Sequence, residues 1–335
     1  MRDVILGLDL GGTTFSVGWL DGADLHGWTS RPTGGHRPRT LVLDDLTAAV
    51  SDAVNTARQH GAAIVGLGVG VPAVIDPQEG RIRLLPNFAG GWNGFPLAAE
   101  LERRCGLPTY LINDARAFLH GESVLGAARG ADDVLGITVG TGVGGGLRLA
   151  GRLRFGPGFT AGEFGHQVID PQGPSCGCGG RGCIEALACG PAIAAAALRP
   201  LKQGRTPHLR QLLGDDLNRL SPQLVAQAAA AGDQECAEVF ARAGHAIGLG
   251  IVNAVSLLDL PVVVIGGGVA QAGPFLLDAV RETLARHLWV SAQPEVRPAA
   301  LGEAAGVIGA AVWAAECGSA RNAAKNLTNP HGGGY

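Results

Sequence analysis

One short stretch of the chain, residues 163–185, concentrates side chains that bind soft metal ions. It contains one histidine and three cysteines: His166, Cys176, Cys178 and Cys183. Four such ligands in a glycine-rich segment that is too short to bury a hydrophobic core of its own are typical of a structural Zn²⁺ site of Cys₃His type. Because this set fills a tetrahedral shell, it leaves no position for an activated water, and the pattern disfavours a zinc-dependent hydrolase.

Two acidic residues, Glu163 and Glu185, bracket the four ligands. Neither acid is needed to complete the metal shell. A metal ion that orders this loop would therefore also fix two carboxylates and one imidazole around a small polar ligand.

A glycine-rich turn lies near the start of the chain. An apolar run, residues 4–9, ends in Asp9 and leads through Gly11, Gly12 and Thr13 into a second apolar run, residues 15–20, which predicts a hairpin. Adjacent glycines expose backbone N–H groups that can approach an anion, so this turn could hold a phosphate, with Asp9 facing its metal ion. A purely structural turn is the alternative interpretation.

The second half of the chain repeats this pattern. A predicted strand, residues 134–139, is followed by a glycine turn that begins with Gly140, Thr141 and Gly142, and then by a returning strand over residues 147–155. An internal duplication is the simplest explanation. A third glycine run follows the strand predicted over residues 261–265 and consists of Gly266, Gly267 and Gly268.

A further acid, Asp114, follows Asn113 directly after a strand predicted over residues 109–112. In an open α/β sheet, an acid at the carboxyl end of a strand points into the crevice where ligands bind. Asp114 could instead simply cap the helix predicted over residues 115–125.

The remaining elements follow from apolar periodicity and from glycine and proline breakers. Residues 71–96 contain too many breakers for a regular element and predict a long functional loop or a cleft wall. We expect a further strand over residues 64–69 and a short edge strand over 295–297, and helices over residues 41–60, 97–105, 191–198, 221–231, 233–258, 274–288 and 303–316.

The composition limits the possible partners. A length of 335 residues predicts about two domains. A formal net charge of −3 without a basic block argues against nucleic acid and anionic membranes as partners. The scattered remaining cysteines and the start of the chain, which lacks an apolar leader, predict a reducing, cytoplasmic location. The longest uncharged run, residues 260–277, contains prolines and glycines, which disfavours a membrane span.

Together these motifs resemble the ROK family (repressors, open reading frames and kinases), above all its bacterial glucokinases. The resemblance covers about residues 3–317, and the cysteine loop is its most specific part. It implies two ribonuclease-H-like α/β domains of the actin/hexokinase type flanking a cleft. The smaller domain would span residues 1–113, with the helix at 303–317 packing back on it. The larger would span residues 114–302 with the zinc loop 163–185, and residues 319–335 would form a disordered tail.

The resemblance also implies an activity: ATP-dependent phosphorylation of a hexose at its 6-hydroxyl, most simply glucose to glucose 6-phosphate. Asp114 would be the general base and would also bind the sugar. The other residues that hold the sugar hydroxyls would be Asn87, Asn113, Glu163, His166 and Glu185. His166 would serve twice, with one ring nitrogen on structural zinc and the other facing the sugar. The Mg²⁺ of ATP would lie near Asp9, and phosphates would bind at Gly11, Gly12, Thr13, Gly140, Thr141 and Gly142. Gly266, Gly267 and Gly268 would line the adenosine pocket, although a plain strand-to-helix turn explains that run equally well.

Two positions depart from the family pattern. Thr14 stands where the family usually has lysine, and Ala73 stands where it usually has glycine after a proline. Other hexoses or N-acetylhexosamines (N-acetylglucosamine, N-acetylmannosamine, mannose, fructose or allose) and other donors (polyphosphate or ADP) stay open. A sugar-sensing repressor of the same family would need an N-terminal helix-turn-helix, whereas the first strand here begins at Val4. Alanine-rich helical faces late in the chain predict a homodimer or homotetramer.

Overall fold

The structure is a computed structural model that describes residues 1–86 and 88–328. Its chain divides into two compact units. Unit 1 consists of Met1–Arg129, Phe155–Thr160 and the chain from Ala304 onward, and unit 2 consists of Gly130–Arg154 and Ala161–Glu303. The boundary expected between residues 113 and 114 therefore falls inside unit 1.

Unit 1 is built on a five-stranded sheet of order β3-β2-β1-β4-β7. The strands β1, β2 and β3 form an antiparallel meander, and β4 and β7 run parallel to β1. The strand bounds are β1 (Arg2–Leu10), β2 (Thr14–Asp21), β3 (Asp24–Pro32), β4 (Ala62–Val71) and β7 (Thr109–Asn113).

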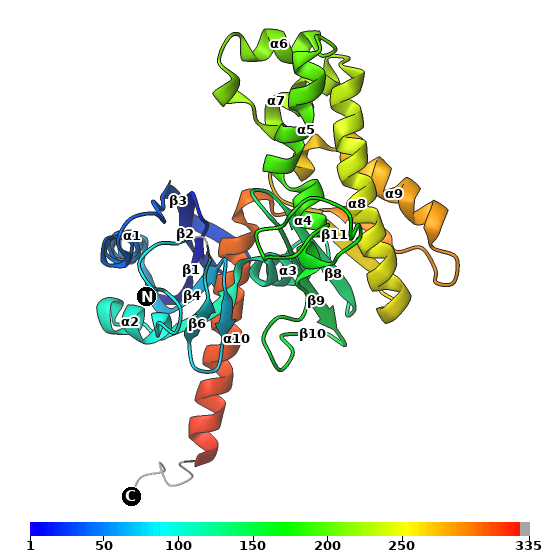
Figure 1. Cartoon of the computed structure of the whole chain (residues 1–335). Helices are drawn as coiled ribbons and strands as arrows, with labels where there is room; N and C mark the ends of the chain where they lie inside the picture. Colours follow the sequence, from blue (N-terminus) through cyan, green and yellow to red (C-terminus); the bar gives the residue numbers. More distant parts are fainter. Residues whose placement is uncertain (87, 329–335) are drawn as a thin grey trace, which may run out of the picture. The chain divides into compact units, whose positions relative to one another are not determined.

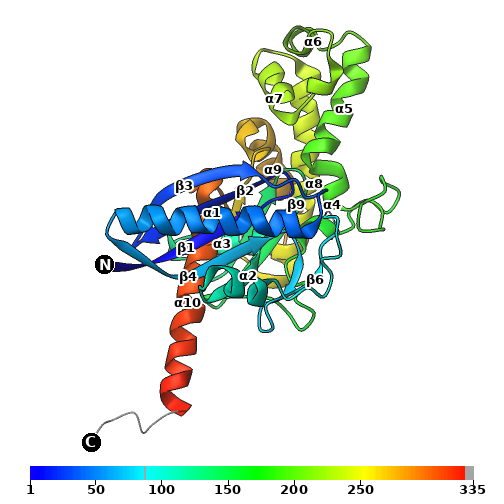
Figure 2. The same cartoon turned by 90° about the vertical axis from the view of Figure 1, so that its left-hand side faces the viewer.

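Helices cover both faces of this sheet, as Figures 1 and 2 show. On one face lie α1 (Arg39–Gln59) and α2 (Leu97–Cys105), which bury Leu6 and Leu8 in an apolar core. On the other lie α3 (Asp114–Val124) and α10 (Ala305–Thr328). Both faces are buried, which explains why β1 reads as a continuous apolar run.

Glycines let α10 lie directly on the sheet. A Cβ added to Gly7 of β1 would stand 2.0 Å from the carbonyl oxygen of Val307, and one added to Gly68 of β4 would stand 1.8 Å from that of Ala310. Because α3 packs along α10, it joins unit 1, which is the physical reason for the shifted boundary. The helix α10 also continues to Thr328, so residues 319–328 are helical where the sequence predicted a disordered tail.

Unit 2 contains a second five-stranded sheet, of order β10-β9-β8-β11-β12. Its strands are β8 (Val134–Val139), β9 (Val143–Leu149), β10 (Arg152–Leu153), β11 (Val262–Gly266) and β12 (Glu295–Pro298). Again an antiparallel meander is extended by two strands parallel to its first strand. The two sheets therefore share one topology, and the predicted duplication and two-domain α/β fold class are confirmed.

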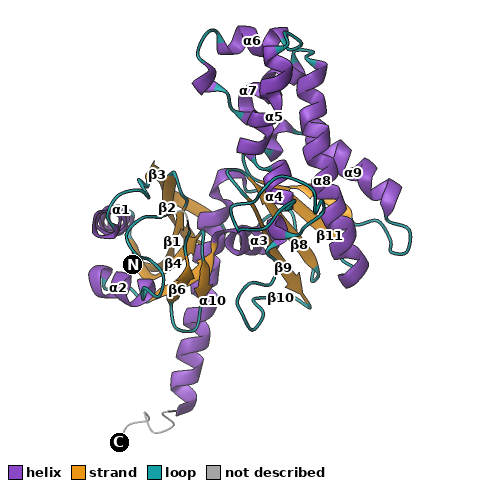
Figure 3. Ribbon diagram, in the orientation of Figure 1, coloured by secondary structure: helices purple, strands orange, loops and turns teal. Residues whose placement is uncertain are grey.

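The helices of unit 2 contribute most of the residues of its hydrophobic core. Figure 3 shows α5, α6 and α7 gathered in one helical group, with the long helix α8 running from it along the sheet region. The bounds are α4 (Ile184–Ala188), α5 (Gly190–Lys202), α6 (Pro207–Leu213), α7 (Pro222–Ala230), α8 (Gln234–Leu258) and α9 (Pro274–His287). Short 3₁₀ turns are η1 (Phe164–His166), η2 (Leu217–Arg219), η3 (Ala270–Ala272) and η4 (Gly302–Ala304).

The helix α8 is long and apolar enough to match a membrane span by length and composition alone. Its apolar face, which includes Phe240, Ile247 and Ile251, is buried in the core of unit 2, and α8 packs along α9. This packing explains the high hydropathy of α8: it is a helix of the protein core.

The proline-rich segment 71–96 differs from expectation, because it contains a short hairpin of β5 (Val74–Asp76) and β6 (Arg81–Leu84). Pro72, Pro77 and Pro86 lie just outside these strands, where a missing N–H breaks no ladder hydrogen bond. Helix α6, which the sequence analysis did not predict, begins with Pro207 at its first position.

Candidate functional site

The four predicted zinc ligands lie together in unit 2. The ligand atoms of His166, Cys176, Cys178 and Cys183 all lie within 4.8 Å of one another. The Sγ atoms of Cys178 and Cys183 are 3.7 Å apart, and Cys176 Sγ lies 3.8 Å from His166 Nδ1. Zinc–sulfur bonds of about 2.3 Å in a tetrahedron place two sulfurs about 3.8 Å apart, so the donor set fits zinc.

The loop that carries these ligands is held by backbone bonds and has little core. Val168 pairs with Cys183, and Ser175 pairs with Arg181 across it. Glycine is required at position 182, where φ is +64° and a Cβ would stand 1.5 Å from the carbonyl oxygen of Asp170. A segment this poor in buried side chains gains order from a metal ion.

The thiols of this cluster differ in acidity. Burial raises the pKa of Cys183 to about 12, whereas a backbone hydrogen bond from Gly180 lowers the pKa of Cys178. A bound zinc ion would have to displace the Cys183 proton, so the affinity for zinc falls as the pH falls.

Glu185 links this cluster to the second glycine turn. It lies in the first turn of α4, one residue beyond Ile184, which follows the ligand Cys183. Its Oε1 lies 3.8 Å from Cys176 Sγ, and its Oε2 accepts a hydrogen bond of 3.0 Å from the backbone N–H of Val143. The other bracketing acid, Glu163, precedes η1 and is half-buried.

The predicted nucleotide residues of unit 2 also gather. The N–H of Gly140 donates to the carbonyl of Gly142 and closes the turn that contains Thr141, while the carbonyl of Gly140 accepts from Gly190 N–H at 2.7 Å. The third glycine run meets the same strand end, because a Cβ on Gly267 would stand 2.4 Å from the carbonyl oxygen of Val139. Gly266 ends β11 and Gly268 follows Gly267.

The contact of Gly190 with this turn was missed in the sequence analysis. Gly190 is the first residue of α5 and is followed by Pro191, a pairing that is typical of a helix start. A Cβ at Gly190 would stand 3.0 Å from the carbonyl oxygen of Gly140. The Gly-Pro pair after the cysteine loop was the signal that could have indicated it.

Unit 1 holds the predicted carboxylates Asp9 and Asp114. Asp9 is enclosed by β4 and the first turn of α10, since a Cβ on Gly70 would stand 3.1 Å from Asp9 Oδ1 and one on Gly306 would stand 2.2 Å from Oδ2. Oδ1 is buried and accepts no hydrogen bond from the described residues. Desolvation, followed by the charge of Asp114, raises the pKa of Asp9 to about 7. An orphaned buried carboxylate of this kind is suited to a cation.

Asp114 is the first residue of α3, and its neighbour Asn113 caps that helix. Asn113 Oδ1 accepts from Arg116 N–H at 3.2 Å, and its Nδ2 donates to Asp114 Oδ1 at 2.9 Å and to the carbonyl of Ala73 at 3.3 Å. Asp114 Oδ1 also accepts from Ala115 N–H at 2.8 Å. The cap is therefore Asn113, and the Asp114 carboxylate is held in one orientation.

The first glycine turn is pinned by Thr33. The fully buried Thr33 donates its hydroxyl to the carbonyl of Gly11 at 2.8 Å and its N–H to that of Thr13 at 2.8 Å. Gly12 has open space around it. Thr14, which stands where the family usually has lysine, is exposed at the start of β2. Thr33 was missed because a single threonine before a helix carries no distinctive signal.

The predicted sugar residues divide between the units. Glu163, His166 and Glu185 belong to unit 2, and Asn113 and Asp114 belong to unit 1. Asn87 lies outside the described residues.

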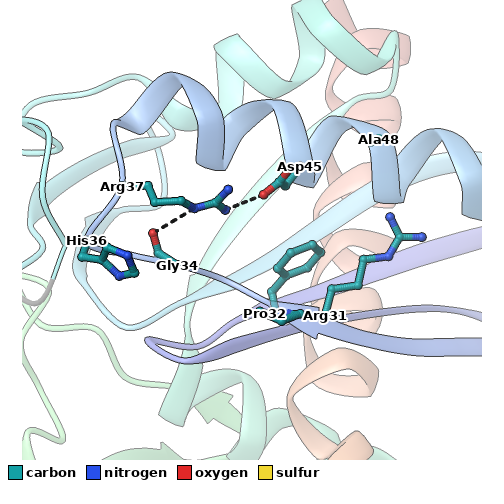
Figure 4. A pocket seen from close by; sticks show the side chains of 8 residues that line it. Arg31, Pro32, Gly34, His36, Arg37, Asp45 and Ala48 are labelled. Atoms are coloured by element: carbon teal, nitrogen blue, oxygen red, sulfur yellow. Dashed lines mark hydrogen bonds and ion pairs between the residues drawn. The ribbon is translucent and has the colours of Figure 1, made fainter.

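A cavity of unit 1, of about 440 Å³, is not lined by any predicted site residue. Figure 4 shows Arg37 beside Asp45 and Gly34 at one end of it and Arg31 at the other. Arg31 forms an ion pair with Asp52, so both guanidinium groups have carboxylate partners. The cavity is lined by Phe15, Arg31, Pro32, Gly34, His36, Arg37, Asp45 and Ala48.

Comparison with known proteins identifies the family. The sequence profile of the ROK family matches residues 5–317. The chain belongs to the ROK family. It is 34% identical over 311 residues to a protein named glucokinase from Thermotoga maritima, covering 92% of this chain and 96% of that protein. It is 33% identical over 314 residues to an N-acetylmannosamine kinase of Escherichia coli O127:H6, covering 92% of this chain and 97% of the relative.

A solved structure agrees with this assignment. The ROK family glucokinase of Streptomyces griseus, crystallised with glucose and AMPPNP, matches this fold with a TM-score of 0.84 and 32% identity. The match covers 93% of this chain and 99% of that one.

Proposed function

We propose that this ROK protein is a hexokinase-type sugar kinase that transfers the γ-phosphoryl group of ATP to the 6-hydroxyl of glucose. The observation that carries the proposal is the Asp114 carboxylate, fixed by Asn113 at the end of β7 and electrostatically coupled to Asp9. A phosphoryl acceptor hydroxyl needs such a positioned base. The glucokinase relatives at 32–34% identity support glucose as the first substrate to test.

Asp114 would accept the proton of the sugar hydroxyl as its oxygen attacks the γ-phosphorus in line. The in-line geometry is compatible with a carboxylate whose orientation is set beforehand, because the base then loses little side-chain entropy on binding. The remaining sugar hydroxyls would be bound by Asn87, Asn113, Glu163, His166 and Glu185. Paired donors and acceptors of this kind match vicinal hydroxyls.

The nucleotide would use the three glycine segments. Phosphates would bind at Gly11–Thr13 and Gly140–Gly142, and adenosine at Gly266–Gly268. Mg²⁺ bound with ATP would neutralise phosphate charge, and the buried Asp9 Oδ1 makes Asp9 the residue suited to face it. Zinc at the Cys₃His cluster would order the loop without entering the reaction.

A crossed panel of sugars and donors tests this proposal. Purified protein should turn over glucose with Mg-ATP in an assay coupled to ADP formation, and elemental analysis should find about one zinc per chain. Polyphosphate and ADP belong in the donor panel. Absence of turnover on every sugar would contradict the kinase assignment.

N-acetylmannosamine is the second candidate substrate, because a kinase named for it shares 33% identity over 92% of this chain. A higher kcat/KM for N-acetylmannosamine than for glucose would replace glucose in the proposal and leave the chemistry at Asp114 unchanged. A homodimer or homotetramer and a cytoplasmic location stay predictions, and light scattering on the purified protein tests the first.

A further inference from the structure

The second glycine turn is braced from one side by Glu185. The Oε2 atom of Glu185 accepts from Val143 N–H at 3.0 Å, directly after the turn Gly140–Gly142. A Cβ on Gly142 would stand 2.5 Å from the same oxygen, so only glycine admits the carboxylate there. The carboxylate therefore lies directly against the turn.

Both ends of α4 are tied to this turn. Its first turn carries Glu185, and the N–H of Gly190, two residues beyond its end, donates to the carbonyl of Gly140 at 2.7 Å. The short helix starts immediately after the ligand Cys183. A displacement of Cys183 would therefore be transmitted to both contact points.

The other branch of the cluster packs on the strand that leaves the turn. A Cβ on Gly165 would stand 1.9 Å from the carbonyl oxygen of Val143, and one on Gly145 would stand 2.4 Å from Phe164 Cβ. His166 follows Phe164 and Gly165 in η1. Three of the four ligands are thereby linked to the turn. Cys176 lies 3.8 Å from Glu185 Oε1, Cys183 lies two residues before Glu185 in the chain, and His166 directly follows Gly165.

We propose that Glu185 is a positioning residue for the second phosphate turn, and that the Cys₃His cluster keeps this turn in its nucleotide-binding shape. Nucleotide affinity then depends on the cluster even when no sugar is bound. This inference rests on the proposed function and adds to it, because the family resemblance assigns Glu185 only to sugar. The charge-assisted bond to Val143 N–H is of the stronger class of protein hydrogen bonds.

Titration calorimetry with Mg-AMPPNP in the absence of sugar tests the inference. Glu185→Ala should weaken AMPPNP binding about tenfold, since a hydrogen bond to a charged group is lost. Glu185→Gln keeps an acceptor for Val143 and should restore affinity to within about threefold. The matched control is Glu282→Ala, which removes an exposed acid of α9 in the same unit but keeps the Glu185 bond, and it should leave AMPPNP affinity unchanged.

A second variant acts through the metal and leaves Glu185 intact. Cys178 is the exposed one of the three cysteine ligands, and Cys178→Ser should lower the zinc content and the AMPPNP affinity together. Circular dichroism checks that each variant is folded. If Glu185→Ala does not fold, Cys178→Ser still tests the inference.

The outcomes separate the two proposals. Failure of the wild-type protein to bind AMPPNP contradicts the proposed function. Normal binding by the wild type with unchanged affinity in Glu185→Ala or in zinc-depleted Cys178→Ser overturns the inference alone. Loss of glucose affinity without loss of AMPPNP affinity in Glu185→Ala would return Glu185 to a purely sugar-binding role.

Discussion

At the scale of single residues, the two carboxylates of unit 1 differ in how they are satisfied. Asp114 is oriented by the Asn113 amide and by the N–H of Ala115. Asp9 has a buried oxygen without a hydrogen-bond donor among the described residues. This asymmetry suits one group to take a proton and the other to meet a cation.

Replacing Asp114 tests the first role. Asp114→Asn keeps the size and hydrogen bonding of the side chain but removes the basic oxygen, so kcat should fall by about 10²–10⁴-fold. The dissociation constant for glucose should change by less than about threefold, as measured by calorimetry without nucleotide. Comparable turnover in the variant would reject Asp114 as the base.

The titration of Asp9 gives a dependence of stability on pH. Its folded-state pKa is raised from 3.8 to about 7, so the folded state holds the proton more tightly than the unfolded state. The stabilising contribution is complete below pH 4 and is lost as the pH rises to about 7. Asp9→Asn should therefore be more stable than the wild type at pH 8, by on the order of a few kcal/mol, and nearly equal to it at pH 4.

Urea unfolding of both proteins in metal-free buffer measures this difference. Taking the variant against the wild type at each pH cancels the titration of the groups that do not interact with Asp9. A difference that does not grow between pH 4 and pH 8 would show that the Asp9 carboxyl is not held protonated.

At the scale of elements, unit 1 depends on how closely α10 approaches its sheet. Gly7 and Gly68 provide the space, since either Cβ would overlap the helix backbone. The closeness of this contact also brings Gly306 of α10 against Asp9. The packing of one helix therefore sets the environment of a predicted site residue.

Substitution within one strand tests this contact. Gly68→Ala places a Cβ 1.8 Å from the carbonyl oxygen of Ala310 and should lower the free energy of unfolding by about 2 kcal/mol or more. Gly66→Ala is the control on the same strand, because its Cβ would meet Ile5 at an ordinary 3.5 Å and should change stability by less than about 1 kcal/mol. Equal effects in chemical denaturation would contradict the close approach of α10.

At the scale of the whole molecule, the two units have separate hydrophobic cores and unequal tryptophan content. Four of the five tryptophans, Trp19, Trp28, Trp92 and Trp313, belong to unit 1. Unit 2 contains only Trp289, which is 87% exposed. Tryptophan fluorescence therefore reports mainly on unit 1, whereas far-UV circular dichroism reports on both.

Metal removal should separate these two signals. A chelator that strips the Cys₃His cluster should lower the unfolding temperature followed by circular dichroism, because the metal stabilises only the state that binds it. The fluorescence transition should shift less, since the buried Trp19 and Trp92 and the half-buried Trp313 lie in the other unit. Identical shifts in both signals would mean that the units unfold as one.

Sequence patterns predicted the parts of the fold that repeat with a clear period or motif. The apolar runs of β1 and β8 and the cysteine spacing predicted both sheets' first strands and the metal cluster. Two features were missed: Asn113 takes the cap in place of Asp114, and α3 joins unit 1 through α10. The first is a choice between adjacent polar residues that the pattern leaves open. The second is made by a packing partner almost two hundred residues away, which local patterns do not contain.

The interrupted path of the chain through unit 1 has a consequence for synthesis. Unit 2 is complete in the chain once residue 303 has been made, but unit 1 lacks α10 until residues 305–328 have been made. Until then the face of the first sheet around Gly7 and Gly68 stays uncovered on the nascent chain. Unit 1 is thus the last to mature, and a chain that stops short of α10 would leave its first-made sheet open to chaperones and aggregation.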